Sequence, residues 1–558
     1  MTYKLNHNGY HITSSSLLDT ELDELKKYLT VKPKVHDYCQ DAPEYPLYHE
    51  TDTHITIPRY VGKKKYKNLK FNDKNIENSG FKFLLNLREY QIDITNKCID
   101  HTIKYGGGVL SVPPGRGKTI MALYMAAKFG LKTLVIVHKT FLQDQWIERA
   151  KQFTNAKIGT IRQNIVDVEG CDIVIGMLQS LSMRDYDNDI FNKFGFVIVD
   201  ETHHIASKVF SRALFKTGAK YTLGLSATPI RADGLSYVLD WFLGKIMYRE
   251  ETHVNTQVVV KKLNYRSDDK LFTEQKSWVN GKMRPSFVKM ISNLIELTER
   301  DEHILDVIKC MIDQNSLRKV LILSGRIKHL EHLKNNIDEY IKKQTLNGSL
   351  CEDEIKTSFY IGSLSQAQRK TAEADADIIF ASYGMAEEGL DIDRLNTIIL
   401  ATPKKNVEQA VGRIMRKILN GVGLKPLIID FSDALSIFIS QGTARHKLYK
   451  KGKYKIDEYY IKNKNLVSKS QYNEETTTDT INSNNGTKMS DIILDIDKDD
   501  YIYNVEPEKS IIANIISNNI EQTSKKSDEM YDSDDSDEVL CYSMPKRATK
   551  KAIKSKKA

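Results

Sequence analysis

The sequence predicts an α/β protein with two tandem, doubly wound parallel sheets, a small α+β N-terminal domain and a disordered C-terminal tail. Between residues 87 and 250, short apolar runs alternate with segments long enough for helices; the runs lie at 108–112, 133–137, 172–176, 196–200 and 221–226. The same alternation returns after residue 300, with runs at 319–324, 376–382, 396–402 and 426–431. This alternation is typical of parallel sheets covered by helices on both faces.

The length of 558 residues allows three or four domains of about 100–200 residues each. The first part is mixed, with a helical pattern at 17–29 and a short strand-like run at 54–60. We expect an N-terminal accessory domain at 1–85, a first α/β domain at 86–250, a linker at 251–300, a second α/β domain at 301–462 and a tail at 463–558.

The tail differs from the rest of the chain in composition. Asn, Ser, Thr, Asp and Lys dominate after residue 463, which predicts disorder because too little apolar surface can be buried. An acidic Ser/Asp block at 528–538 is typical of a phosphorylated region, and a basic block at 545–557 is typical of a nuclear signal or a nucleic-acid patch. A solvated terminus without function is the alternative.

The overall charge is basic, at +9 with a pI near 8.8. Lys and Arg can neutralise the phosphates of a polyanionic partner, although many soluble proteins are equally basic for other reasons. Six cysteines are scattered without a CxxC pair, which argues against a local zinc site and a disulfide framework and favours a reducing compartment.

No secretory or membrane segment is expected. The first residues contain no apolar core of a signal peptide. The longest apolar runs are also far shorter than the ~18 residues that span a bilayer. We therefore expect no membrane partner.

The segment at 109–129 has the pattern of a phosphate-binding loop between a strand and a helix. Gly115 and Gly117 permit a tight turn whose backbone N–H groups face phosphate oxygens, and the following helix N-terminus attracts anions. Lys118 can reach the β- and γ-phosphates, and the Thr119 hydroxyl can hold Mg²⁺. The strict pattern asks for Gly where Val112 stands, but the ending GxGKT is intact. An ordinary Gly-rich turn is the alternative.

An acidic pair follows the apolar run at 196–199. In an open parallel sheet, ligands lie beyond the carboxyl ends of strands, so Asp200 and Glu201 should emerge at the edge that carries Lys118. Asp200 would help to hold Mg²⁺ and Glu201 would polarise the attacking water. His203 lies near enough in sequence to sense the γ-phosphate. A solvated acidic loop is the alternative.

Two later segments complete the candidate site. Ser226 and Thr228 follow a strand directly and can hydrogen-bond the acidic segment. In the second domain, four residues share roughly one helical face by their spacing: Gln409, Gly412, Arg413 and Arg416. The two arginines could close over the γ-phosphate, although a solvated basic face is the alternative.

Seven blocks in order resemble the superfamily 2 helicases of the DExH type: LREYQ (87–91), VPPGRGKT (112–119), VIVHKTFLQDQW (135–146), DETH (200–203), SAT (226–228), EEGLDI (387–392) and QAVGRIMR (409–416). Within that superfamily the chain looks most like the helicases of large DNA viruses related to the poxvirus transcript-release DNA helicase, with 45–62 and 225–244 as the closest segments. It is also similar to TFIIH-type and phage recombination helicases.

The resemblance implies two RecA-like P-loop NTPase domains that use ATP and Mg²⁺. It implies an adenine contact for Gln91, with Arg88 beside it, and arginine fingers at Arg413 and Arg416. Gly389 and Asp391 would contact both nucleotide and nucleic acid. The implied nucleotide-binding loop and its partner on the second domain comprise Pro113, Pro114, Gly115, Arg116, Gly117, Lys118, Thr119 and Gln409. The implied nucleic-acid contacts are His138, Gln179, Ser324 and Arg326.

We therefore expect a nucleic-acid-stimulated ATPase that acts as a helicase or translocase, with DNA favoured over RNA. Viral transcription termination, replication and repair are the expected settings, with the transcription machinery as a partner. The expected location is intracellular: a cytoplasmic factory, the virion or the nucleus. An RNA helicase is one alternative, and a translocase that remodels complexes without unwinding is another. A nucleotide-gated scaffold is a third, but it should lack Lys118, Glu201 or Arg413. The sequence does not define an oligomeric state.

Overall fold

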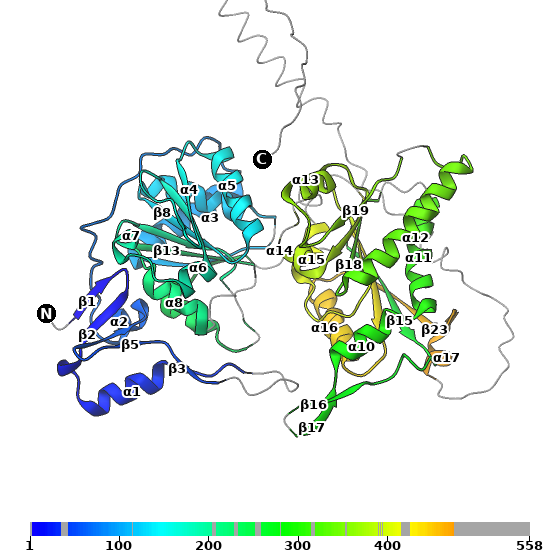
Figure 1. Ribbon diagram of the computed structural model, residues 1–558, viewed down its shortest axis with the longest axis horizontal. Coiled ribbons are helices and arrows are strands. Elements are labelled where there is room, and N and C mark those ends of the chain that lie inside the picture. The colour runs from blue at the N-terminus through cyan, green and yellow to red at the C-terminus, as the bar shows by residue number, and fades with distance from the viewer. Residues whose placement is uncertain are drawn as a thin grey trace, which may run out of the picture. The chain divides into compact units, whose positions relative to one another are not determined.

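The computed structural model describes residues 3–34, 43–113, 115–202, 208–227, 231, 233–250, 258–279, 281–313, 318–351, 354–388, 390, 392, 394–414 and 424–473. Two eight-stranded sheets and a small N-terminal sheet organise these residues (Figure 1). The expected α/β fold class, with two RecA-like sheets and a small α+β N-terminal domain, is confirmed.

The N-terminal part is a four-stranded antiparallel sheet in the order β1-β2-β6-β5. Its strands are β1 (Tyr3–Asn6), β2 (Gly9–Thr13), β5 (His49–Glu50) and β6 (His54–Ile57), and its helices are η1 (Ser14–Ser16), α1 (Asp19–Leu29) and α2 (Arg59–Lys65); β3 (Thr30–Val31) pairs with β4 (Tyr45–Pro46). Apolar side chains of these elements, such as Tyr10, Leu25 and Ile55, form one buried core.

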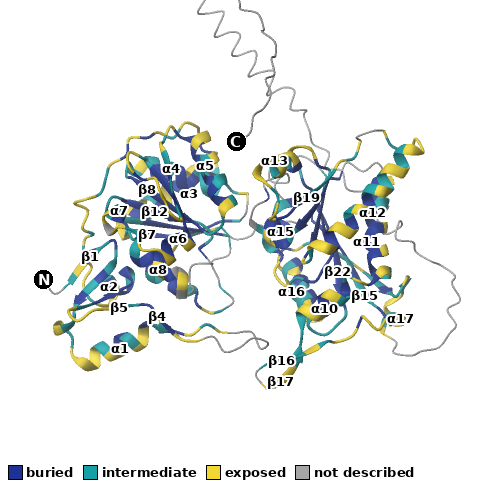
Figure 2. Ribbon diagram, viewed as in Figure 1, coloured by how far each residue is buried: buried dark blue, intermediate teal, exposed yellow. Residues whose placement is uncertain are grey.

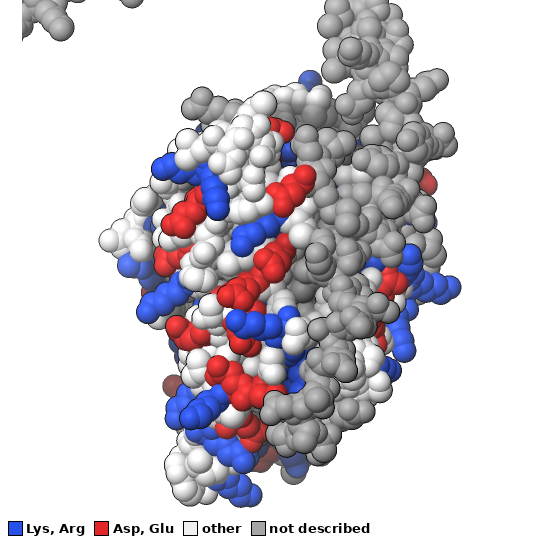
Figure 3. Space-filling view, turned by 90° about the vertical axis from the view of Figure 1, so that its right-hand side faces the viewer, with Lys and Arg blue, Asp and Glu red and all other residues white. Residues whose placement is uncertain are grey.

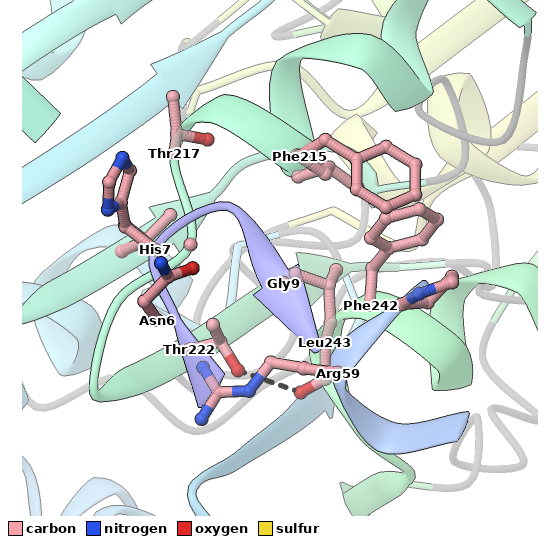
Figure 4. Close-up of a pocket in the computed structure, with 13 residues that line it drawn as sticks. Asn6, His7, Gly9, Arg59, Phe215, Thr217, Thr222, Phe242 and Leu243 are labelled. Atoms are coloured by element: carbon pink, nitrogen blue, oxygen red, sulfur yellow. Dashed lines mark hydrogen bonds between the residues drawn. The ribbon is translucent and has the colours of Figure 1, made fainter. Parts of the chain in front are cut away.

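This N-terminal part packs on the first large sheet. Arg59 donates to the backbone carbonyls of Ala219 and Lys220, and the N–H of Gly218 donates to the carbonyl of His7 over 2.8 Å. Between them lies a cavity of about 20 Å³ in which the side chains of Phe215 and Phe242 meet (Figure 4). A cavity of this size accommodates about one water molecule, so the two parts are closely packed.

The first large sheet has the order β10-β9-β11-β8-β12-β13-β7-β14 and is parallel except for the β9–β10 hairpin. The strands are β7 (Gly107–Ser111), β8 (Thr133–Val137), β9 (Ile158–Arg162), β10 (Ile165–Val166), β11 (Ile173–Met177), β12 (Phe196–Val199), β13 (Tyr221–Ser226) and β14 (Ile246–Arg249). All five apolar runs expected here are strands.

Alternate residues of these strands belong to different cores. Val135 and Ile198 pack with helices α3 (Glu89–Tyr105), α4 (Lys118–Phe129) and α5 (Thr140–Phe153). Ile136 and Val197 pack on the other face, which helices α6 (Leu178–Met183), α7 (Asn188–Asn192), α8 (Lys208–Lys216) and α9 (Ser236–Leu243) cover. The sheet is therefore buried on both sides (Figure 2).

The second large sheet has the order β19-β20-β18-β21-β22-β15-β23-β24. The strands are β15 (Val259–Arg266), β18 (Val320–Ser324), β19 (Thr357–Tyr360), β20 (Ile378–Ser382), β21 (Thr397–Leu400), β22 (Leu427–Asp433), β23 (Lys455–Lys462) and β24 (Asn465–Val467). The helices are α10 (Phe287–Leu294), α11 (Thr298–Asp313), α12 (Ile327–Leu346), α13 (Gln366–Asp375), α14 (Tyr383–Glu388), α15 (Glu408–Ile414), α16 (Ile437–Lys451) and α17 (Lys469–Asn473). A separate hairpin joins β16 (Lys276–Val279) to β17 (Lys282–Pro285).

The expected boundaries of the second domain need two corrections. The expected linker at 251–300 contains β15, which pairs with both β22 and β23, so this sheet begins before residue 301. The expected tail from residue 463 contains β24 and α17, so the ordered domain continues past residue 462. The remainder of the tail, from residue 474, lies outside the described residues. None of the helices named above is long and apolar enough to cross a bilayer.

Candidate active site

The Gly-rich loop lies between β7 and α4, as its sequence predicts. Gly115 and Gly117 have φ of +82° and +80°, in the left-handed region that favours glycine. Gly117 precedes the first residue of α4, Lys118, and a Cβ on it would lie 2.4 Å from Nε2 of Gln91. Val112 is fully buried in the sheet core, so the residue that departs from the strict pattern lies beneath the loop. Pro113 is half-buried, and Pro114 lies outside the described residues.

Gln91 ties the loop to helix α3. Its side chain is 3% exposed; Oε1 accepts from the N–H of Arg88 over 3.1 Å and Nε2 donates to the carbonyl of Arg116 over 3.1 Å. Both ends of the amide therefore bond within the protein, while the Arg88 side chain is exposed. The expected adenine contact of this pair stays a prediction.

Arg116 is held by Tyr90, which belongs to the recognised block at 87–91, and by Glu250, which the sequence does not indicate. Its guanidinium lies 4.0 Å from the centre of the Tyr90 ring, and its Nε donates to Oε2 of Glu250 over 2.9 Å. Glu250 follows β14, far along the chain from the loop. A salt bridge and a ring contact thus fix the loop between α3 and the last strand of the sheet.

The structure brings Lys118, Asp200 and Glu201 together at the carboxyl edge of the sheet. Nζ of Lys118 lies 3.9 Å from Oε1 of Glu201, and both side chains are largely buried. The N–H of Glu201 donates to Oδ1 of Asp200 over 3.0 Å, and Glu201 has a φ of +46°. The expected juxtaposition of the loop lysine and the acidic pair is present.

The Asp200 carboxylate is half-buried and is oriented by a side chain of helix α5. Its Oδ2 accepts from Nε1 of Trp146 over 2.8 Å. Burial raises the pKa of Asp200 to about 6, with the negative charge of Glu201 as the second cause; Trp146 and Lys118 oppose the rise. Trp146 ends the recognised block at 135–146, but the sequence does not assign it this contact, since an apolar residue on a helix is usually part of a core.

The donor set at this edge suits Mg²⁺. Magnesium binds oxygen ligands and commonly uses one or two carboxylates together with substrate phosphates. Asp200 supplies a carboxylate whose two oxygens are each oriented by one hydrogen bond. Thr119 supplies a hydroxyl in the first turn of α4. Within the described ranges, no group of three or more His, Cys, Asp or Glu side chains could hold another metal ion.

The remaining predicted nucleotide residues are placed as follows. Ser226 ends β13 and is fully buried. Gln409 and Arg413 lie on α15, where Nε of Arg413 donates to the carbonyl of Ala386 over 3.0 Å. His203, Thr228, Gly389, Asp391 and Arg416 lie outside the described residues.

Gln179 is exposed at the start of α6 and lines a groove of about 480 Å³. The groove also contains Arg162 and Arg184, and no carboxylate lines it, which suits phosphates. The sequence does not indicate these two arginines, because they are separated from every recognised block. His138 follows β8 and is half-buried.

Ser324 is in a position that does not support its expected contact with nucleic acid. The residue is fully buried, and its hydroxyl bonds Nδ1 of His329 at 3.0 Å and accepts from the N–H of Arg326 over 3.1 Å. Nε2 of His329 in turn bonds Asp301 at 2.9 Å. Ser324 therefore orders the start of α12, whereas the half-exposed Arg326 stays a candidate contact.

Comparisons with known proteins agree with this geometry. The family described as type III restriction enzyme, res subunit, matches residues 84–231, and the family described as helicase conserved C-terminal domain matches residues 302–418. A protein of Acanthamoeba polyphaga mimivirus, named as an ATP-dependent RNA helicase, is 36% identical over 478 residues, which cover 82% of this chain and 87% of that protein.

Two further viral relatives extend the similarity. A protein of Invertebrate iridescent virus 6, named as a helicase, is 29% identical over 379 residues, covering 66% of this chain and 82% of that protein. A protein of African swine fever virus, named as an ATP-dependent RNA helicase, is 26% identical over 402 residues, covering 66% of this chain and 74% of that protein. With one of these two families matching each large sheet and a viral helicase relative along most of its length, this chain belongs to the superfamily 2 helicases of large DNA viruses and is a nucleic-acid-dependent ATPase.

Proposed function

We propose that the chain is an ATP- and Mg²⁺-dependent motor that translocates along DNA and unwinds it. The observation that carries this proposal is the group of Lys118, Asp200 and Glu201 at one edge of the first sheet, with Nζ of Lys118 3.9 Å from Oε1 of Glu201. A cation, a metal-binding carboxylate and a general base at one point are the groups that phosphoryl transfer to water requires.

The ion pair between Lys118 and Glu201 has a consequence for turnover. When the phosphates of ATP enter the loop, the ammonium group of Lys118 leaves the carboxylate of Glu201 and contacts phosphate oxygens. Glu201 would then orient a water and accept its proton, and Asp200 and Thr119 would hold Mg²⁺. The bound ion would neutralise charge on the phosphate oxygens.

Glu201→Gln tests this assignment because it keeps the size of the side chain and removes the base. We expect the variant to bind ATP as the wild type does and to lose turnover by about 10²–10⁴-fold, the usual contribution of a general base. Unchanged turnover would reject Glu201 as the water-activating residue.

The second domain supplies arginines to the same reaction. We propose that Arg413 and Arg416 approach the γ-phosphate, with Gln409 beside them. We also propose that His203, Ser226 and Thr228 couple phosphate binding to the grip on the nucleic-acid strand. Arg413 now donates to backbone carbonyls at the end of α14, so it must release them to act. Arg413→Ala should lower kcat by about 10³-fold, and an unchanged kcat would exclude its role.

DNA is the substrate that we favour, and RNA is the second candidate because the mimivirus and African swine fever virus relatives are named as RNA helicases. Contacts from Gln179 and Arg326 to the phosphodiester backbone would not distinguish one base from another. Stimulation of the ATPase by matched DNA and RNA oligonucleotides separates the two substrates. Equal or greater stimulation by RNA would overturn our choice of DNA.

Unwinding and a role in the viral cycle are tested separately. Strand displacement, measured beside displacement of a protein roadblock, distinguishes a helicase from a translocase that only remodels complexes. We propose that the motor acts in viral transcription, in a cytoplasmic factory or the virion, with replication and repair as alternative settings. Co-purification with the viral transcription machinery tests the partner, and deletion of the basic block at 545–557 tests a nuclear location.

A further inference from the structure

The hairpin of β16 and β17 stands apart from both large sheets. Its two strands pair only with each other, in the register Trp278 opposite Met283 and Ser277 opposite Arg284. It precedes α10, in which the side chain of Met290 is fully buried in the core of the second domain. The hairpin therefore projects from an anchored helix (Figure 1).

An exposed tryptophan lies on this hairpin. Trp278 is 73% exposed, and its cross-strand neighbour Met283 is 51% exposed. By contrast, Trp146 is 2% exposed, and Trp241 packs against Tyr28 and Tyr237. A large aromatic side chain that remains in water contributes nothing to the core, so its position favours a role in recognition.

The hairpin that carries Trp278 is cationic as a whole. The segment 274–289 contains four basic residues (Lys276, Lys282, Arg284 and Lys289) and one acidic residue (Glu274), for a net charge of 4 − 1 = +3. Glu274 pairs with Lys276 over 3.2 Å, whereas Lys282 and Arg284 have no carboxylate partner among the described residues. Figure 3 shows Lys and Arg side chains at the lower end of this face, with Asp and Glu side chains among them.

We propose that this hairpin binds single-stranded nucleic acid, with Trp278 stacked on an unpaired base on one face and with Lys282 and Arg284, which the register places on the opposite face, against phosphates of the same strand. A hairpin that carries an exposed aromatic side chain and a net positive charge recognises any base and a phosphodiester backbone together. The inference rests on the proposed nucleic-acid motor and adds a contact that none of the recognised sequence blocks contains.

The test compares Trp278→Ala, Trp278→Phe and wild type for binding to an oligothymidylate strand, by fluorescence anisotropy. Stacking of one base predicts about tenfold weaker binding for Trp278→Ala and near wild-type binding for Trp278→Phe. Because Trp278 is 73% exposed, its truncation removes no core contact. Tyr105→Ala is the matched control, since Tyr105 is 50% exposed and carries Lys104 5.1 Å from its ring centre but lies outside the hairpin.

Two further measurements separate a base contact from a general loss of binding. The strand should quench part of the tryptophan emission of wild type, and this quenching should be absent from Trp278→Ala, which keeps Trp146 and Trp241. In the double variant Lys282→Gln, Arg284→Gln, the slope of log affinity against log salt should fall by about 1.4, or about 0.7 per lost phosphate contact.

Wild type could bind the strand without a change in emission while Trp278→Ala binds it equally well. That result would overturn the hairpin site alone and point to a protein partner. A wild type that binds neither DNA nor RNA would reject the proposed motor together with this contact.

Discussion

Trp146 donates its indole N–H to the Asp200 carboxylate over 2.8 Å and thereby connects helix α5 to the end of strand β12. Trp146 is buried and Asp200 is half-buried. Helix α5 begins directly after His138 and Lys139, which belong to a block that the family resemblance assigns to the nucleic-acid track. The contact is thus a direct physical link between the proposed strand-binding segment and the proposed metal-binding carboxylate.

Replacing Trp146 by Phe should remove the hydrogen bond to Asp200 without leaving a large cavity in the core. The variant keeps an aromatic ring but removes the only N–H that Trp146 offers to Asp200. We expect about tenfold lower kcat, since a hydrogen bond to a charged group contributes about 1.5–3 kcal/mol. Steady-state ATPase should also show a higher Mg²⁺ concentration at half-saturation. If the Mg²⁺ dependence is unchanged while the thermal stability falls, Trp146 has only a structural role.

Replacing Lys118 by Ala should abolish turnover through the loss of phosphate binding. The variant removes the cation that reaches the phosphates, and the loss of one such group lowers kcat by about 10²–10³-fold. Lys104→Ala is the control, because Lys104 is an exposed lysine near the end of the preceding helix. Direct binding of a fluorescent ATP analogue distinguishes lost binding from lost chemistry. Full activity in the Lys118 variant would contradict the proposed site.

His11 should make the N-terminal part sensitive to acid. Burial lowers the pKa of His11 from 6.5 to about 4, and the charge of His54 adds to this effect. Between these pH values the unfolded chain takes up a proton that the folded chain resists, so stability falls as the pH falls from about 6.5 towards 4.

Thermal unfolding at pH 7 and pH 5 checks this expectation. His11→Gln removes the titration while retaining a side chain that can bond Asn6 and Thr56, the two partners of His11. The variant should lose less stability between the two pH values than the wild type. An equal loss would assign the acid sensitivity to other groups.

Removing one partner of a buried ion pair should strongly destabilise the second domain. Nη2 of Arg445 donates to Asp430 over 2.7 Å, and the hydroxyl of Tyr449 donates to the same carboxylate over 2.9 Å; all three side chains are buried. Arg445→Met leaves a buried carboxylate without its cation and should cost about 3–5 kcal/mol in the free energy of unfolding. Denaturant unfolding measures this loss. The double variant Arg445→Met, Asp430→Leu should recover most of it, and failure to recover would show that shape rather than charge is the cause.

The sequence by itself determined five strands of the first large sheet (β7, β8, β11, β12 and β13) and the Gly-rich loop, whereas β9, β10 and β14 were not predicted. Both signals are local: an apolar run such as 133–137 is already a buried strand by its composition, and the glycines before Lys118 specify a turn between adjacent residues. The order of the blocks then predicted that Asp200 and Glu201 reach the same edge, because the carboxyl ends of parallel strands meet there.

Only the tertiary structure decided which distant residues complete these elements. Strand β15 became part of the second sheet through β22 and β23, which come far later in the chain, so no local pattern could place it there. The same holds for Trp146 and Asp200, whose hydrogen bond joins residues 54 positions apart. The structure also buries Ser324, which does not support its expected contact with nucleic acid, and leaves Trp278 exposed. The sequence could not show either, because the exposure of a side chain depends on what the rest of the chain packs against it.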